Sequence, residues 1–248
     1  MMSDEENTFV WPGGRLGAVS LTFDDGLRSQ LEIVVPRLNE RGLRGTFYLN
    51  PRDGWEQKLA PWQEAHRAGH EMGNHTIAHP CSLNIQPTLQ RWTLAQLEAD
   101  ILEAERRLST LFPEPNGRSF AYPCYEDYVG RGLTRQSYVP LVARHFVAGR
   151  AKGTSMRGNH PIHADLHHLS SWNAEAMTPW EMIGLVETTI AEGWWGVFTF
   201  HGINEGHLAI SENWFCALLD YLAGQSEIIW TAPVAVVARY IQQHAHKG

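Results

Sequence analysis

The sequence has few cysteines, an excess of acidic over basic residues and no long apolar run, and each shortage excludes a class of protein. The three cysteines in 248 residues, Cys81, Cys124 and Cys216, are too few and too odd in number for a disulfide framework. Lysine and arginine number 20 against 27 acidic residues, and the net charge of -7 disfavours nucleic acid or an anionic membrane as partner. No apolar run approaches the roughly 20 residues of a membrane span.

The amino terminus also lacks the pattern of a secretory signal. Residues 1–14 are acidic where such a signal would be basic and then apolar. With 43% hydrophobic and 19% charged residues, the composition is that of a globular protein. No repeat, low-complexity tract or linker divides the chain. We therefore expect one domain over residues 1–248 and a cytoplasmic location; the oligomeric state is left open. Cys81 could be a soft metal ligand or a partner of Cys124, but we expect free thiols.

Helical and strand-like patterns alternate along the chain. Four helical patterns end at a glycine (Gly42, Gly69, Gly193 and Gly224), and each is followed within a few residues by an apolar, strand-like run. Thr93 with Gln96, and Thr178 with Glu181, have the spacing of a capping box at a helix start. This alternation predicts an α/β protein with a mostly parallel sheet covered by helices.

Polar side chains follow four of the predicted strands directly. Asp24 and Asp25 follow residues 18–23, His75 and His79 follow residues 71–74, Tyr122 to Tyr125 follow residues 119–121, and His201 follows residues 197–200. Barrel enzymes build their sites from the carboxyl ends of several strands, whereas an open sheet concentrates them at one switch point. The pattern therefore favours a barrel.

Asp24, Asp25, His75 and His79 have the composition of a metal site. Adjacent carboxylates after a buried strand repel each other, and a metal ion relieves this by taking one as a ligand and leaving the other as a base. The His-x-x-x-His spacing places two imidazoles on one side of a turn or helix. Alone, the aspartates would indicate a helix N-cap. Two histidines and one carboxylate suit zinc and, by ligand type alone, non-haem iron.

His201 has no histidine partner at metal-binding spacing, so we interpret it as a proton donor rather than a ligand. A histidine-rich stretch at His160, His163, His167 and His168 is more typical of a solvated loop than of a second metal site.

Four segments together resemble the polysaccharide deacetylase family, the NodB-homology group of carbohydrate esterase family 4. They are Thr22–Gly26, His75–His79, Phe120–Pro123 and Phe200–His201. The resemblance implies a distorted (β/α) barrel of about seven parallel strands. It also implies one divalent metal, favouring Zn²⁺ with Co²⁺, Ni²⁺ or Mn²⁺ as alternatives, on Asp25, His75 and His79. Asp24 would be the base, His201 the acid, and the backbone N–H of Cys124 an oxyanion donor.

The sequence departs from this family at positions around the base and the acetyl group. Ala121 replaces an arginine that commonly orients the base, and Thr199 replaces a leucine that lines the acetyl pocket. A cation must then come from elsewhere. Arg150 follows a predicted strand over residues 145–149 and is our candidate, whereas Arg118 precedes its strand and should lie at the opposite end. Tyr122, Thr199, Trp172 and Trp230 are candidate substrate contacts.

These features predict a metal-dependent hydrolase that removes acetyl groups from an N- or O-acetylated polysaccharide or oligosaccharide, acting on non-peptide carbon–nitrogen bonds in the N-acetyl case. Two alternatives have distinct signatures. A related hydrolase of cyclic amides or imides would work without metal, and a silent glycan-binding domain would bind without turnover.

Overall fold

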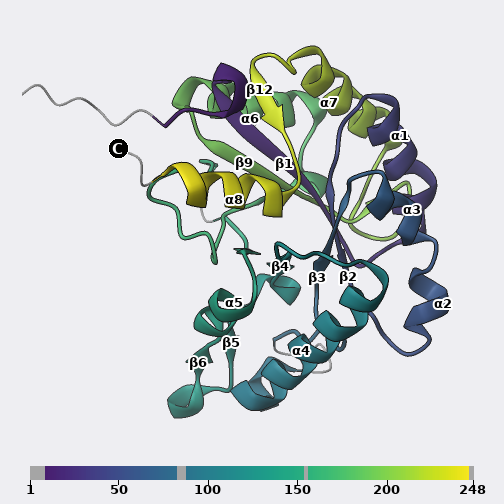
Figure 1. Ribbon diagram of the computed structural model, residues 1–248, viewed down its shortest axis with the longest axis vertical. Helices are drawn as coiled ribbons and strands as arrows, with labels where there is room; N and C mark the ends of the chain where they lie inside the picture. The colour runs from purple at the N-terminus through teal and green to yellow at the C-terminus, as the bar shows by residue number, and fades with distance from the viewer. Residues whose placement is uncertain (1–8, 83–87, 154–155, 246–248) are drawn as a thin grey trace, which may run out of the picture.

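The computed structural model describes residues 9–82, 88–153 and 156–245. Its centre is a sheet whose strand pairs are all parallel, in the order β7-β4-β3-β2-β1-β9-β8, and β12 also pairs with β1 (Figure 1). The strands of this sheet are β1 (Gly17–Asp24), β2 (Thr46–Leu49), β3 (Glu71–Asn74), β4 (Ser119–Ala121), β7 (Ala148–Arg150), β8 (Trp172–Asn173), β9 (Trp195–Phe200) and β12 (Ile229–Thr231).

The helices lie outside this sheet, as the alternation in the sequence predicts (Figure 1). They are α1 (Val35–Glu40), α2 (Trp55–Leu59), α3 (Trp62–Arg67), α4 (Leu94–Leu111), α5 (Val139–His145), α6 (Pro179–Glu192), α7 (Glu212–Gly224) and α8 (Val234–His244). A π-helical segment at Gln30–Val34 precedes α1. Two small ladders, β5 (Tyr128–Val129) with β6 (Gln136–Ser137) and β10 (Gly202–Ile203) with β11 (Ala209–Ile210), lie apart from this sheet.

The sheet curls until its two edge strands are joined by one short segment. Leu169 donates its N–H to Gly149 of β7 and accepts from Ala151, both at 2.8 Å, and the chain then continues into β8 beside β9. Residues 169–173 therefore bridge β7 to β9. The result is the distorted barrel that the sequence predicts, with seven parallel strands in the order from β7 to β8, β12 added beside β1, and few hydrogen bonds at this junction.

The alternation of side chains along β1 separates the polar interior from the apolar layer under the helices. Val19, Leu21 and Phe23 belong to the main hydrophobic cluster, which includes Phe215 of α7. Side chains two residues apart on a strand share a face, so Ser20, Thr22 and Asp24 lie together on the other face. All three are buried. The side chains on this face of β1 therefore form a row of buried polar groups that ends with Asp24 at the carboxyl end of the barrel.

Glu71 closes the amino end of the barrel with a buried polar network. One carboxylate oxygen accepts from Ser119, and the other accepts from Thr46 Oγ1 at 2.8 Å and from the backbone N–H of Ala235 at 3.0 Å. Arg118 lies toward the same end, where it donates to Met72 O at 2.6 Å. This confirms that Arg118 and the polar residues after the strands occupy opposite ends.

Most of the predicted helix boundaries are confirmed. Thr93 and Thr178 form capping boxes at the starts of α4 and α6, and Gly42, Gly69 and Gly193 have positive φ angles at or just beyond the ends of their helices. Two expectations are wrong in detail. Gly224 is the last residue of α7 rather than a left-handed cap. The strand expected at residues 145–149 begins at Ala148, because His145 still belongs to α5.

His70 links three elements in its neutral form, which makes stability depend on pH. Its Nδ1 accepts from the N–H of Gly45 at 3.1 Å, so Nε2 carries the proton toward Asn39 Oδ1 at 3.2 Å. Burial, together with the charge of Arg44, lowers the pKa of His70 to about 4. Protonating Nδ1 would remove the bond to Gly45.

We expect His70 to add stability above pH 6.5 that is lost as pH falls toward 4. The lowered pKa corresponds to about 3 kcal/mol, since the unfolded state takes up the proton first. Denaturant titrations of the wild type and His70→Gln between pH 4 and 7.5 measure this. The variant should show a flatter pH dependence; an unchanged slope would contradict the assignment.

Candidate active site

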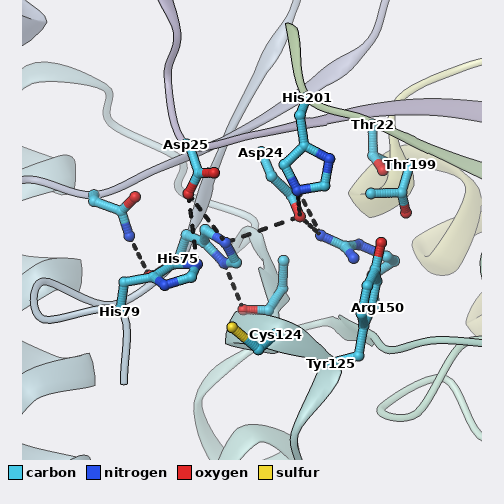
Figure 2. A network of polar contacts seen from close by, with 12 residues as sticks. Thr22, Asp24, Asp25, His75, His79, Cys124, Tyr125, Arg150, Thr199 and His201 are labelled. Atoms are coloured by element: carbon cyan, nitrogen blue, oxygen red, sulfur yellow. Dashed lines mark hydrogen bonds and ion pairs between the residues drawn. The ribbon is translucent and has the colours of Figure 1, made fainter. Parts of the chain in front are cut away.

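The carboxyl end of the barrel brings together polar side chains from four separate strands (Figure 2). Asp24 ends β1 and Asp25 follows it, His75 follows β3, Arg150 ends β7, and His201 follows β9. Asp24 lies at the centre of the group, with the histidines of the His-x-x-x-His segment on one side and Arg150 on the other (Figure 2). The convergence expected from the strand ends is therefore present.

Asp25, His75 and His79 form a cluster with the dimensions of a metal site. The Nε2 atoms of His75 and His79 lie 3.8 and 3.5 Å from Asp25 Oδ1, and the three ligand atoms lie within 4.8 Å of one another. Ligands held at the ~2.0–2.2 Å typical of zinc would be roughly 3.3–3.6 Å apart in a tetrahedron. The donor set and its spacing therefore fit a divalent metal.

The orientation of His75 supports the same conclusion. Its Nδ1 donates to the carbonyl of Ala121 at 2.9 Å, which leaves the lone pair of Nε2 directed at the cluster. Burial lowers the pKa of His75 to about 4, so the ring is neutral at ordinary pH. A neutral imidazole with a fixed tautomer is the form that binds metal.

The segment that carries both histidines is held by side-chain acceptors. Thr76 N donates to Asn74 Oδ1 and His79 N donates to Thr76 Oγ1, both at 2.9 Å. Asp100 of α4 accepts from the backbone of Ile77 at 2.8 Å and of Ala78 at 3.2 Å. These bonds explain why Thr76 and His79 can hold positive φ angles of 63° and 51°.

Asp24 is a buried carboxylate paired with a buried guanidinium. Arg150 Nη2 donates to both oxygens of Asp24, at 2.5 and 2.6 Å, and Arg150 is fully buried. Burial alone would raise the pKa of Asp24, but Arg150, His75 and His201 outweigh it and the pKa lies below the ordinary value. The predicted contact of Arg150 with Asp24 is confirmed.

His201 faces Asp24 and is not part of the metal cluster. Its Nε2 lies 3.9 Å from Asp24 Oδ2, and the side chain is 14% exposed. Gln30 donates to the backbone carbonyls of both Asp24 and His201, at 2.5 and 3.0 Å, which ties the ends of β1 and β9 together. The ring is thus placed between the carboxylate and solvent.

The turn after β4 differs from the sequence expectation because Cys81 and Cys124 form a disulfide. The expectation of free thiols is therefore wrong for this pair, whereas Cys216 is free. The sequence count could not reveal the pairing, because the two residues are 43 positions apart and meet only when β3 and β4 pair. Cys124 and Tyr125 both have positive φ angles, 51° and 59°.

Three predicted substrate contacts have side chains that pack against other residues of the protein. The Tyr122 side chain is buried in a hydrophobic cluster and donates to the carbonyl of His167. Trp172 is 4% exposed and packs on Phe198. Trp230 pairs with Ala18 near the start of β1, six residues before Asp24, and packs on Tyr240. In all three cases the sequence places an aromatic residue near a strand end, where its side chain can face the core as readily as the site.

Thr199 is close to the site but buried, with its hydroxyl donating to Ser171 Oγ at 2.9 Å. Tyr125 and Tyr48 are additional neighbours of the site. The guanidinium of Arg150 lies 5.2 Å from the ring centroid of each. Tyr125 also donates to Asn173 Oδ1 at 2.7 Å, and Gly73 leaves room for the Tyr48 ring. Tyr125 could have been predicted from the sequence because it directly follows Cys124. Tyr48 could not, because it lies inside a strand and belongs to none of the motifs.

Fold and site together define a (β/α) barrel protein with a two-histidine, one-aspartate cluster beside a buried base. Residues 13–131 match the family model described as polysaccharide deacetylase. Together with the motifs quoted above, this match confirms the resemblance of the chain to the polysaccharide deacetylase family. A search of curated proteins finds no match.

Solved structures show the same fold at low identity. A putative polysaccharide deacetylase from Mycobacterium smegmatis is 15% identical with a TM-score of 0.70, covering 95% of this chain and 94% of that one. A probable polysaccharide deacetylase from Pseudomonas aeruginosa PAO1 is 12% identical with a TM-score of 0.67, covering 94% and 93%. A family 4 acetyl xylan esterase from Clostridium thermocellum, in complex with a cobalt ion, is 16% identical with a TM-score of 0.55, covering 90% and 91%.

We expect the metal-free protein to bind one equivalent of Zn²⁺ or Co²⁺, and His75→Ala to weaken this binding by more than ~100-fold, because a ligand is lost. Isothermal titration calorimetry measures both. His163→Ala is the matched control, since His163 is exposed and stacks on His160 away from the cluster. Equal affinity in wild type and His75→Ala would exclude this site.

Proposed function

We propose that this protein is a metal-dependent hydrolase that removes acetyl groups from an acetylated polysaccharide or oligosaccharide. The observation that carries the proposal is the placement of Asp24. The carboxylate lies 3.9 Å from His75 Nε2 of the metal cluster and 3.9 Å from His201, and Arg150 keeps it ionised. A base, an acid and a metal cluster around one point are the components of metal-assisted hydrolysis.

Asp25, His75 and His79 would hold the metal, for which we favour Zn²⁺, with Co²⁺, Ni²⁺ or Mn²⁺ as substitutes that accept the same donors. When bound, such an ion acidifies water and polarises a carbonyl. Two nitrogens and one oxygen leave at least one tetrahedral position for water or substrate.

The proton transfers fall to Asp24 and His201. Asp24 accepts a proton from the attacking water, and its lowered pKa keeps it ionised at neutral pH. Arg150 fixes the carboxylate through two hydrogen bonds, and Asp24 Oδ2 lies 3.9 Å from both His75 Nε2 and His201 Nε2. His201 then donates a proton to the sugar nitrogen or oxygen that leaves.

The backbone N–H of Cys124 would stabilise the oxyanion that forms on the acetyl carbon. Cys124 is exposed in the turn that follows β4. The carbonyl of Ala121, in the same segment, orients His75. The turn therefore contributes both to the metal cluster and to the predicted oxyanion donor.

The substrate class follows from the family rather than from a single contact. Among the similar structures are an acetyl xylan esterase from Clostridium thermocellum and the peptidoglycan deacetylase PdaC from Bacillus subtilis, which differ in the glycan they act on. We propose an acetylated glycan and treat N- against O-acetyl preference as a question for assay.

The two alternatives receive less support. A metal-independent hydrolase of cyclic amides would have no use for the cluster of Asp25, His75 and His79. A silent glycan-binding domain would be consistent with the missing arginine at Ala121, but Arg150 supplies a guanidinium to Asp24.

Acetate release tests the proposal. Acetylated chito-oligosaccharides and acetylated xylan are assayed with the purified protein, with a chelator, and after metal is added back. We expect release that the chelator abolishes and metal restores. Release that persists without metal would favour the ring-opening class, and binding without release would favour the silent domain.

His201→Ala should lower kcat by ~10²–10⁴-fold while metal affinity stays unchanged, because His201 donates a proton without ligating the ion. Acetate release and calorimetry are measured on the same preparation. His207→Ala, an exposed histidine in the following loop, is the control. Loss of metal together with loss of kcat would instead make His201 a ligand or a structural residue.

Arg150→Ala and Arg118→Ala form a matched pair of buried arginine deletions. Removing Arg150 leaves Asp24 buried without its cation, so the pKa of Asp24 rises. On acidification, the variant therefore loses activity at a higher pH than the wild type does. Removing Arg118 takes a donor from Met72, Phe112 and Glu105, so stability falls by ~3–5 kcal/mol while the pKa of Asp24 is unaffected.

Both deletions lower the denaturant midpoint, so the pH profile of kcat/KM is the measurement that separates the two variants. The acid limb of the profile should move upward only in Arg150→Ala. If both variants keep the wild-type acid limb, Arg150 does not control the base.

A further inference from the structure

A disulfide joins the segment that carries His79 to the turn that carries the predicted oxyanion donor. Cys81 lies two residues after His79, and Cys124 is the middle residue of the turn Pro123–Tyr125. Their Cα atoms are 5.6 Å apart. Cys81 Sγ lies 3.6 Å from His79 Nδ1, on the opposite side of the ring from the metal cluster. One covalent bond therefore connects two walls of the site.

The backbone on both sides of this bond has unfavourable conformations. His79, Cys124 and Tyr125 have φ angles of 51°, 51° and 59°, in the left-handed region that non-glycine residues rarely occupy. Such residues persist only where surrounding contacts fix them, and they concentrate at functional sites. The contacts that hold the segment of His79 differ from those that hold the turn of Cys124 and Tyr125.

The metal segment has its own supports. His79 N, Thr76 N and the amides of Ile77 and Ala78 all donate to side-chain oxygens of the protein. The turn is held at its end by Glu126, whose N–H donates to Pro123 O at 3.0 Å and whose carboxylate accepts from Ser82 Oγ at 2.7 Å. Within the turn, the side chain of Cys124 depends on the disulfide. Tyr125 is held through its backbone to Tyr122 O and through its hydroxyl to Asn173, whereas the side chain of Cys124 is anchored by Sγ to Cys81. Breaking the disulfide should release the turn and spare the metal segment.

We propose that the Cys81–Cys124 disulfide is a redox-sensitive clamp that positions the Cys124 backbone N–H, so that reduction lowers catalysis without removing the metal. The regulatory part of this inference rests on the proposed deacetylase function. In the switching step a dithiol delivers two electrons and two protons, the S–S bond breaks into two thiols, and the dithiol is oxidised to its disulfide.

The experiment compares the oxidised full-length protein with protein reduced by a phosphine, which does not chelate the metal, and desalted without oxygen. Reduction should speed amide hydrogen exchange over residues 122–129 by ~10-fold or more, since the turn then opens locally. It should lower kcat by ~10-fold or more, because an oxyanion donor is displaced, and leave metal affinity within ~3-fold. Reoxidation should restore both properties.

Three variants separate positioning from general stabilisation. Cys81→Ser with Cys124→Ser should behave as reduced protein under all conditions. Cys81→Ser with Cys124→Gly should recover part of the lost kcat, since glycine adopts a left-handed φ freely. Cys216→Ser, at the free cysteine of α7, should keep the full response to reduction. Equal kcat in the serine and glycine double variants would overturn the positioning role.

Other outcomes also decide the question. Unchanged exchange over residues 122–129 after reduction would overturn the clamp. A fall in metal affinity as large as the fall in kcat would also overturn it, because the effect would then lie at His79. Uptake of a second metal by the reduced thiols with His79 would overturn it as well. If the oxidised protein releases no acetate, the proposed function fails, but exchange and metal affinity still test the clamp.

Discussion

The buried pair of Asp24 and Arg150 is the interaction on which the site depends. Neither charge could be buried alone at acceptable cost, and removing one partner of such a pair typically costs ~3–5 kcal/mol. The pair also joins β1 to β7, which lie four strands apart in the sheet order. Because the guanidinium rests near the rings of Tyr48 and Tyr125, the carboxylate has one defined position relative to the metal cluster.

The turn that follows β4 combines strain with restraint. Two consecutive left-handed residues cost roughly 1–3 kcal/mol each. A disulfide that closes a loop of about 43 residues removes about 4 kcal/mol of unfolded-state entropy in the chain-entropy model. The two quantities are of similar size, so the cross-link can offset the strain of the turn. The hydrogen bond from Tyr125 to Asn173 adds a restraint from β8.

The sequence predicted the parts of this structure that depend on local pattern. Capping boxes fixed the starts of α4 and α6, and polar residues at strand ends located Asp25, His75 and His79 together. It could not predict contacts that depend on how strands are ordered. The disulfide, the Tyr48 ring beneath Arg150 and the burial of Trp172 each require β3, β4, β7 or β8 in place. Arg150 was found only because the base needed a cation.

The central strand also determines when the barrel can form during synthesis. β1 is made well before two of its partners, since β9 and β12 follow it by roughly 170 and 210 residues. At 5–20 residues per second the ribosome needs roughly 10–40 s to produce them. Until then β2 is the earliest strand to pair with β1, and it does so over Thr22–Asp24. A nascent chain of this topology must therefore keep β1, which is buried along its whole length in the folded protein, from misassociating until β9 and β12 have been made.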